Sequence, residues 1–330
     1  MIDCLVHRIR WDLVGAMKEW LPNTLDAVRD SIRVRETTLL PRACFRICFS
    51  YAPQMSPPKI SARVKDILVC PECRGSLGEK GDTLGCQGCA RSFAISNAVP
   101  VFLSQPLQLV APDHSSNPIG PEYEAVLRAG NDFVLNIGAG GTAQRYPNCI
   151  EFEHKIFRHT DVVGDAHHLP FREGTFDRVF AFNVFEHLAD PMTAAQEIHR
   201  VLKPGGAVVI HTAFLQALHE EPHHFYNATE YGVRRWFAPF EIEDCRVSGN
   251  FGPGVMLAFL MSNVLETARL SEMPSKQRDL LKASKIGDWA EFWGKWGETP
   301  PGFDALQSLP QPMQKRIAAG FELIAKKSGA

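Results

Sequence analysis

The fold is decided by the stretch Phe133-Val134-Leu135-Asn136-Ile137-Gly138-Ala139-Gly140-Gly141-Thr142. A short apolar run breaks abruptly into glycines, and this pattern predicts a buried strand that ends in a tight turn. Glycine lets the backbone adopt positive φ and lets a ligand approach the chain closely. A turn of this kind, at the carboxyl end of a first strand, typically holds a nucleotide-type cofactor in an open α/β sheet.

The residues after the glycines indicate the class of cofactor. Gly138 to Ala143 fits the G-x-G-x-x-A pattern of dinucleotide sites, which also need a full helix whose N-terminus holds the pyrophosphate. Pro147 comes only seven residues after Gly140, which leaves room for about one helical turn. The sequence therefore disfavours NAD.

Strand-like and helix-like segments alternate after the glycine stretch, which predicts a mainly parallel α/β sheet. Further strands are expected over 149–153, 161–166, 176–183, 207–212 and 240–247, and helices over 122–129, 191–202, 231–237 and 255–265. Asp161 comes only eight residues after Glu153. The helix that usually links two parallel strands is therefore missing there or reduced to a loop.

Composition and charge narrow the class of protein. Among the 330 residues, 45% are hydrophobic and 22% are charged, as in ordinary soluble proteins. The net charge of −2 gives no global attraction to nucleic acid or to an anionic membrane. No apolar run reaches the ~18–20 residues of a membrane span, and the N-terminus lacks the pattern of a secretion signal. We expect a cytoplasmic protein.

Four of the nine cysteines form two Cys-x-x-Cys pairs: Cys70, Cys73, Cys86 and Cys89. The twelve residues between the pairs suffice for a β-hairpin that returns the second pair to the first. Four sulfurs close the tetrahedral shell of a structural Zn²⁺ ion. Metal binding on the order of 10–16 kcal/mol would supply much of the folding free energy of so short a segment. An iron–sulfur centre is the alternative that this spacing favours less.

Five motifs, in order, resemble the class I S-adenosylmethionine-dependent methyltransferases of the small-molecule type. They occupy residues 136–140, 164–171, 176–177, 185–188 and 197–206. The resemblance implies a Rossmann-like, seven-stranded, mainly parallel sheet, which an antiparallel strand over 317–327 would close. We expect four parts: an N-terminal extension over 1–60, a small β-rich zinc ribbon over 61–104, a linker over 105–121 and the methyltransferase domain over 122–330.

The resemblance assigns the methionine and ribose side of the cofactor to the glycine loop. Gly138 and Gly140, with Ala139 between them, would line these moieties, and Glu153 would accept hydrogen bonds from the ribose hydroxyls. Asn136 stands where the family usually has an acid, so a charged hydrogen bond to the cofactor would be lost there.

The resemblance places the adenine and the methyl group at the next strand ends. Asp165 would accept a hydrogen bond from the adenine amino group, and the backbone amide of Ala166 would face a ring nitrogen. Asn183 would border the transferred methyl group. The reaction is an SN2 displacement, in which alignment can supply much of the rate, and a general base is needed only for a weakly acidic acceptor. The candidates for that base are His187, His224 and Tyr226.

The cysteine-rich segment resembles the small zinc-ribbon family that activates tRNA and protein methyltransferases. In that family the ribbon is a separate subunit, whereas here it would be fused to the catalytic domain, with a protein partner through the ribbon as a further expectation. The acceptor is expected to be a small metabolite or a sugar-related compound first, and tRNA or protein second. The alternative is a non-catalytic zinc-ribbon scaffold, suggested by Asn136 and by the short connection after Glu153.

Overall fold

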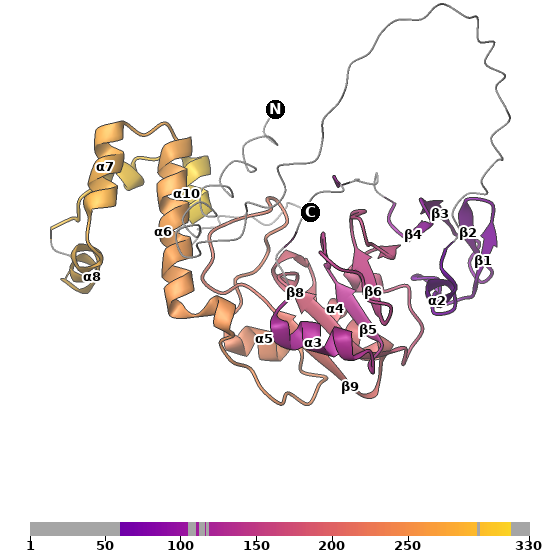
Figure 1. Cartoon of the computed structure of the whole chain (residues 1–330). Helices are drawn as coiled ribbons and strands as arrows, with labels where there is room; N and C mark the ends of the chain where they lie inside the picture. The colour runs from indigo at the N-terminus through magenta and orange to yellow at the C-terminus, as the bar shows by residue number, and fades with distance from the viewer. Residues whose placement is uncertain (1–59, 105–109, 112–115, 117–118, 296–297, 318–330) are drawn as a thin grey trace, which may run out of the picture. The chain divides into compact units, whose positions relative to one another are not determined.

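The computed structural model describes residues 60–104, 110–111, 116, 119–295 and 298–317 (Figure 1). The chain divides into two compact units, Met1–Met55 and Ser56–Ala330, and all described residues belong to the second. The expected N-terminal extension lies outside the described residues except for Ile60, and most of the expected linker does too.

Five strands form the parallel part of the sheet in the order β7-β6-β5-β8-β9. They are β5 (Val134–Ile137), β6 (Cys149–Glu153), β7 (Val162–Val163), β8 (Phe176–Phe182) and β9 (Leu202–His211). All four pairings among them are parallel, which confirms the mainly parallel sheet. Strands β6 and β7 follow β5 on one side of it, whereas β8 and β9 lie on its other side. Ligands bind at such a switch point, here between β5 and β8, in open α/β sheets.

The cysteine-rich segment continues this sheet. Four antiparallel strands, β1 (Leu77–Lys80), β2 (Thr83–Cys86), β3 (Ser92–Ser96) and β4 (Val99–Val101), come after the short helix α2 (Ala62–Lys65). Strand β4 then pairs in parallel with β7 through Val101 and Val163. The sheet has nine strands in the described part of the chain: four come from the cysteine-rich segment and five from the residues after 122, for which the sequence predicts seven.

The short connection between β6 and β7 leaves the edge of β7 free for this pairing. No helix is present between 154 and 161, as the eight-residue spacing predicts. The amide of Phe102 donates to the carbonyl of Val163 at 2.9 Å, and that of Val110 donates to the carbonyl of Ile156 at 3.0 Å. Segments of the same chain thus cover an edge that would otherwise expose unpaired backbone groups.

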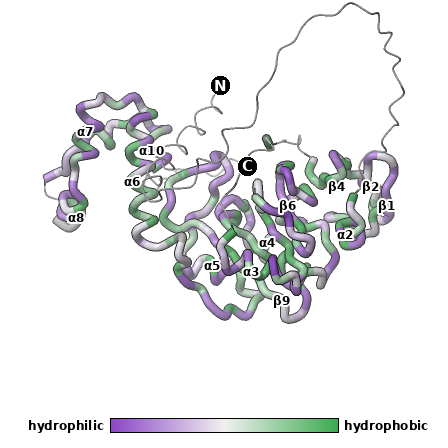
Figure 2. The backbone as a smooth tube through the Cα atoms, in the orientation of Figure 1, coloured by the Kyte–Doolittle hydropathy of each residue, from purple (hydrophilic) through white to green (hydrophobic). Residues whose placement is uncertain are grey.

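The cysteine-rich segment 61–104, called the ribbon from here on, shares one hydrophobic core with the parallel sheet. Val64, Leu68 and Leu84 of the ribbon are buried in the same cluster as Phe152 and Phe171 of the sheet domain. Figure 2 shows hydrophobic residues in the central strands and again near α2 and β4. Each Å² of apolar surface removed from water contributes about 25 cal/mol to stability, so this shared core is a major stabilising contact between the two parts.

The helices close to the sheet form where the sequence predicts them. They are α3 (Pro121–Ala129), α4 (Pro191–Val201) and α5 (Glu230–Trp236). The Asp190 side chain caps α4 by accepting from the Thr193 amide at 3.1 Å, and Thr229 caps α5. Two 3₁₀ turns, η2 (Ala166–His168) and η3 (Phe185–His187), come after β7 and β8 and lie at the edge where the candidate site forms.

The prediction of a strand over 240–247 is wrong, because this segment is irregular. Phe240 and Ile242 pack against the main core without pairing to a strand, so hydrophobic contact alone satisfies the apolar positions of that pattern.

The rest of the described chain is helical. It forms η4 (Gly249–Phe251), α6 (Pro253–Leu270), α7 (Ser275–Ala283), α8 (Ile286–Lys295), α9 (Phe303–Gln307) and α10 (Gln311–Ile317). The predicted closing strand over 317–327 starts at the last residue of α10, and its other residues lie outside the described ones. Among the described residues, no helix is both long enough and apolar enough to cross a membrane.

Candidate cofactor and metal sites

The glycine loop after β5 has the backbone that only glycine adopts readily. Gly138 and Gly140 have φ values of +65° and +63°. A Cβ atom on Gly138 would lie 2.3 Å from Cγ2 of Val184, so the loop and the turn after β8 are in direct contact. No helix is present after the loop between 138 and 148, in keeping with the argument against a dinucleotide.

Glu153 ends β6 beside this loop. Its carboxylate is buried, and Oε1 accepts a hydrogen bond from the amide of Gly140 at 2.7 Å. Oε2 accepts from the amide of His154 at 2.9 Å. Ala139 lies half-buried between the two glycines. The structure therefore brings together Glu153 and the glycine loop, which the sequence assigns to one cofactor.

Asn136 lies opposite a buried acid. It is paired in register with Glu151 on β6, and both residues are buried. Thr142 donates to Oε1 of Glu151 at 2.7 Å, and burial raises the pKa of Glu151 to about 7. A carboxylate at position 136 would face this acid from the neighbouring strand. The neutral amide of Asn136 avoids that repulsion.

Asp165 comes two residues after the end of β7 and caps η2. Its carboxylate accepts hydrogen bonds from the amide of His167 at 2.9 Å and from the imidazole of the same residue. Burial alone would raise the pKa of Asp165, but these hydrogen bonds lower it, and the same contact raises the pKa of His167. Ala166 is buried beside it. His167 also accepts from the amide of Asp190 at 3.1 Å, which fixes this turn against the start of α4.

Asn183 comes directly after β8 in the left-handed region, with φ of +57°. Its amide donates to the carbonyl of His211, the last residue of β9, at 2.9 Å. Strained non-glycine residues of this kind gather at functional sites. Asn183, the glycine loop, Glu153 and Asp165 all lie at the carboxyl ends of neighbouring parallel strands, so the fold places the predicted cofactor residues along one edge.

The three candidate bases lie near one another, but their polar atoms differ in availability. Nδ1 of His187 is 2.8 Å from the carbonyl of His223, and among the described residues Nε2 has no hydrogen-bond partner. His224 uses both ring nitrogens, since Nδ1 accepts from the amide of His219 at 3.2 Å and Nε2 lies 3.2 Å from the carbonyl of Tyr226. Burial lowers the pKa values of His187 and His224, so both are neutral near pH 7.

The hydroxyl of Tyr226 donates to the carbonyl of Ala189 at 3.1 Å. Sequence reasoning missed two neighbouring residues with ligand atoms close to His187, namely Glu186 and His219. Glu186 was visible inside a family motif, whereas no local pattern marks His219.

The four predicted metal-ligand cysteines converge. All their Sγ atoms lie within 4.8 Å of one another, with 3.7 Å between Cys70 and Cys89 and 3.4 Å between Cys73 and Cys86. Two sulfurs bound to one tetrahedral Zn²⁺ at about 2.3 Å are about 3.8 Å apart, whereas a disulfide needs about 2.05 Å. The spacing therefore fits a shared metal ion.

The backbone of the ribbon also fits a metal. The amides of Cys89 and Gly88 lower the pKa of Cys86, which favours the thiolate form that binds a metal. A Cβ atom on Gly75 or on Gly88 would lie 3.2 Å from Sγ of Cys73. These glycines leave room around the sulfurs that a larger residue would occupy.

Two arginines of the ribbon bind acids of the sheet domain. Arg63 pairs with Asp161 at 3.1 Å, and the Asp161 carboxylate, 2% exposed, also accepts from Arg145 and from the amide of Glu151. Arg74, within the first cysteine turn, pairs with Glu197 of α4 at 2.8 Å.

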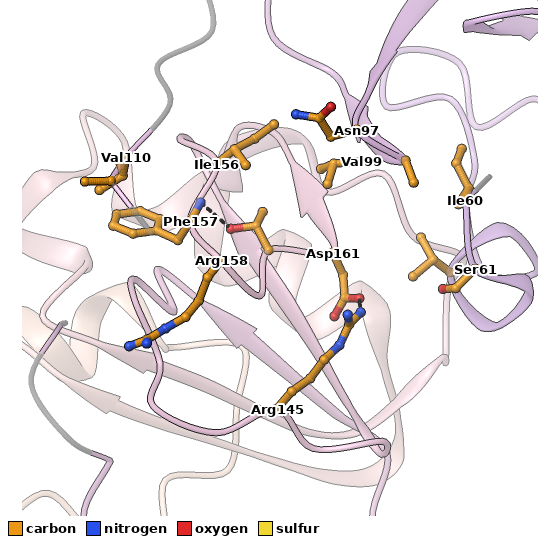
Figure 3. Close-up of a pocket in the computed structure, with 14 residues that line it drawn as sticks. Ile60, Ser61, Asn97, Val99, Val110, Arg145, Ile156, Phe157, Arg158 and Asp161 are labelled. Carbon is orange, nitrogen blue, oxygen red and sulfur yellow. Dashed lines mark hydrogen bonds and ion pairs between the residues drawn. The ribbon is translucent and has the colours of Figure 1, made fainter. Parts of the chain in front are cut away.

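A cavity of about 650 Å³ lies between the ribbon and the connection from β6 to β7. Figure 3 shows Arg145 directed at Asp161 on one side, with Asn97 and Val99 of the ribbon on the other. None of the residues that the sequence assigns to the cofactor lines this cavity.

Comparison with known proteins shows that part of the chain is similar to methyltransferases. The family described as "Methyltransferase domain" matches residues 144–210. The ubiquinone/menaquinone biosynthesis C-methyltransferase UbiE of Coxiella burnetii is 33% identical over 93 residues, which are 28% of this chain and 34% of that protein. The norajmaline N-methyltransferase of Rauvolfia serpentina is 44% identical over 48 residues, 14% of this chain and 16% of that protein. The chain thus spans about a third or less of these relatives.

Solved structures align over parts of the chain. A complex between the Haloferax volcanii Trm112 methyltransferase activator and a methyltransferase aligns at 18% identity over 38% of this chain and 74% of that chain, with a TM-score of 0.27. A phosphoethanolamine N-methyltransferase 2 of Haemonchus contortus, in complex with S-adenosylhomocysteine, aligns at 16% identity over 54% of this chain and 50% of that chain, with a TM-score of 0.30.

Proposed function

We propose that the protein is an S-adenosylmethionine-dependent methyltransferase that carries a structural zinc ribbon in the same chain. The observation that supports this most is the contact between the glycine loop and Glu153. Oε1 of the buried Glu153 carboxylate accepts a hydrogen bond from the amide of Gly140 at 2.7 Å, at the carboxyl end of a parallel sheet, and Glu153 lies within residues 144–210, which match the methyltransferase family. A negatively charged group at that position suits the hydroxyls of a ribose.

The residues present fit the cofactor. Gly138 and Gly140, with Ala139, would lie against its methionine and ribose parts, because the positive φ of the two glycines lets a ligand approach the backbone closely. Asp165 and the Ala166 amide would hold the adenine, and Asn183 would border the methyl group. When bound, S-adenosylmethionine supplies a methyl group already activated by its positive sulfur.

The protein's own contribution would be alignment. Glu153 and the glycine loop fix one end of the cofactor, while the left-handed Asn183 fixes the chain beside the reacting end. Well-oriented groups of this kind supply up to about 7–11 kcal/mol of rate enhancement. The acceptor would be a small metabolite or a sugar-related compound before tRNA or protein. Two relatives whose names refer to small molecules support that order.

The ribbon would hold Zn²⁺ through Cys70, Cys73, Cys86 and Cys89. Because four thiolates leave no coordination position open, the ion would be structural. By analogy with activator ribbons, it would stabilise the methyltransferase domain through the shared core and the arginine contacts. A protein partner on the ribbon stays part of this proposal, as does a cytoplasmic location.

Calorimetric titration of the zinc-replete full chain with S-adenosylhomocysteine tests the proposal. We expect one binding site per chain. Glu153→Ala should weaken binding roughly 10- to 150-fold, because a hydrogen bond to a charged group contributes about 1.5–3 kcal/mol. The matched control is Glu173→Ala, which removes an exposed carboxylate outside the site. Absence of binding by the wild-type chain would contradict the proposal and favour the non-catalytic scaffold.

A further inference from the structure

A second group of metal-ligand side chains lies beside the predicted acceptor position. The ligand atoms of Glu186, His187 and His219 are all within 4.8 Å of one another. Glu186 and His187 belong to η3, directly after β8, while His219 comes from the long loop after β9. This group is separate from the cysteine cluster of the ribbon, and the proposed function uses neither Glu186 nor His219.

Both histidines present the same ring nitrogen. Nδ1 of His187 lies 2.8 Å from the carbonyl of His223, and Nδ1 of His219 lies 2.9 Å from the carbonyl of Ala217. A carbonyl only accepts, so each Nδ1 carries the proton and each Nε2 keeps its lone pair. Metal-binding histidines are usually oriented by such a contact to a backbone carbonyl.

Glu186 supplies the carboxylate of this group. The residue is 1% exposed, and its Oε2 accepts from the hydroxyl of Thr212 at 3.0 Å. Its other oxygen, Oε1, is buried and has no hydrogen-bond partner in the described part of the chain. A buried carboxylate with an unpartnered oxygen is costly unless a cation or a donor compensates it.

We propose that Glu186, His187 and His219 bind a Zn²⁺ ion and leave its fourth coordination position open. Two imidazole nitrogens and one carboxylate oxygen form a ligand set that zinc uses in sites with an open position. Ligands of one tetrahedral Zn²⁺ at about 2.0–2.1 Å are about 3.4 Å apart. The ligand atoms, now within 4.8 Å of one another, would therefore move together by up to about 1.4 Å.

His224 supports this site without joining it. Its ring packs against that of His219 at a tilted angle, with 4.2 Å between the ring centroids, but both of its nitrogens are engaged by the backbone. It would position the His219 segment. Zinc binding would also use the Nε2 atom that a base role of His187 requires, so the two assignments of His187 exclude each other.

Metal counting on the full chain tests the site independently of methyl transfer. The zinc-loaded protein is dialysed against buffered Zn²⁺, and its metal content is measured by mass spectrometry alongside a calorimetric zinc titration. We expect two zinc ions per wild-type chain, one in the ribbon and one here. Glu186→Gln and His219→Gln should each retain one. His223→Gln is the matched control, because it removes an exposed imidazole of the same loop and should keep both ions.

Three outcomes would overturn the site. They are one zinc per wild-type chain at saturation, two in both Glu186→Gln and His219→Gln, or loss of the second ion in His223→Gln as well. Because Glu186 is buried, its variant is paired with the half-buried His219 variant, and thermal unfolding shows that the counted protein is folded.

Discussion

The cysteine cluster of the ribbon and the Glu186–His187–His219 cluster differ in how their ligands come together. The cysteines span 70–89 and converge through two turns and a hairpin, so local spacing alone brings them close. The other cluster joins a turn after β8 to a loop after β9, more than 30 residues along the chain. The first cluster therefore helps to build its own fold, whereas the second exists only because the sheet has already formed.

The largest expected effect concerns the cysteine cluster. Cys70→Ser combined with Cys86→Ser should abolish zinc binding by the ribbon and unfold it, because structural zinc contributes on the order of 10–16 kcal/mol. Glu186→Gln combined with His219→Gln should leave the fold in place. Zinc content and thermal unfolding of both double variants check the contrast. Full zinc content in the cysteine variant would refute the ribbon site.

An ion pair with the sheet domain also holds the ribbon, and Asp161→Asn tests that attachment. The buried carboxylate accepts from Arg63 of the ribbon and from Arg145, so its neutralisation leaves two arginines without their partner. Because the side chains of Arg63 and Arg145 are 27% and 50% exposed, water partly compensates the loss, and we expect a cost of about 2–4 kcal/mol from the charged hydrogen bonds that are weakened. Chemical denaturation should show a loss in this range, while Glu79→Gln, which removes an exposed partner of Lys65, should cost less than about 1 kcal/mol. Equal losses would mean that the Asp161 ion pairs do not hold the ribbon.

Cofactor binding at the carboxyl edge of the sheet should depend on the backbone of the glycine loop rather than on zinc. Gly138→Ala places a methyl group 2.3 Å from Cγ2 of Val184 at a φ of +65°. We expect about 2–4 kcal/mol of destabilisation, from overpacking and left-handed strain together, and loss of S-adenosylhomocysteine binding with ribbon zinc retained. Gly174→Ala is the matched control, because it has φ of +61° and open space around it. It should cost about 1 kcal/mol and keep binding, and a similar effect of both variants would contradict the packing argument.

The smallest effect concerns the buried acid beside Asn136. Burial raises the pKa of Glu151 to about 7 in the folded chain, against about 4.3 when unfolded. The folded state then binds more protons than the unfolded state between these values, so stability falls as the pH rises from about 4.3 to 7. Glu151→Gln should remove about 2 kcal/mol of this decline between pH 5 and pH 8. Denaturation at both pH values measures it, and an unchanged slope would contradict the assigned pKa.

Much of the parallel sheet could be predicted because its signals are local. The glycine stretch, the acids at 153 and 165 and the alternation of apolar runs each depend on a few neighbouring residues. The cysteine spacing predicted the convergence of the four sulfurs for the same reason.

Features set by distant contacts could not be predicted. The pairing of Val101 with Val163 depends on an edge that a missing helix leaves free, and nothing in the ribbon sequence states which strand it will meet. His219 reaches Glu186 only through the path of a long loop. The 240–247 segment has a strand-like pattern, yet Phe240 and Ile242 satisfy it by packing alone. The cofactor and catalytic roles of the site residues stay predictions.

The most direct test of the central claim is a crystal structure of the zinc-loaded chain with S-adenosylhomocysteine. We expect the ligand at the carboxyl edge of the sheet, with its ribose hydroxyls on Glu153, its adenine by Asp165 and Ala166, and its sulfur facing Asn183. Density for the ligand in the cavity bounded by Asn97, Arg145 and Asp161 instead, with an empty glycine loop, would contradict it.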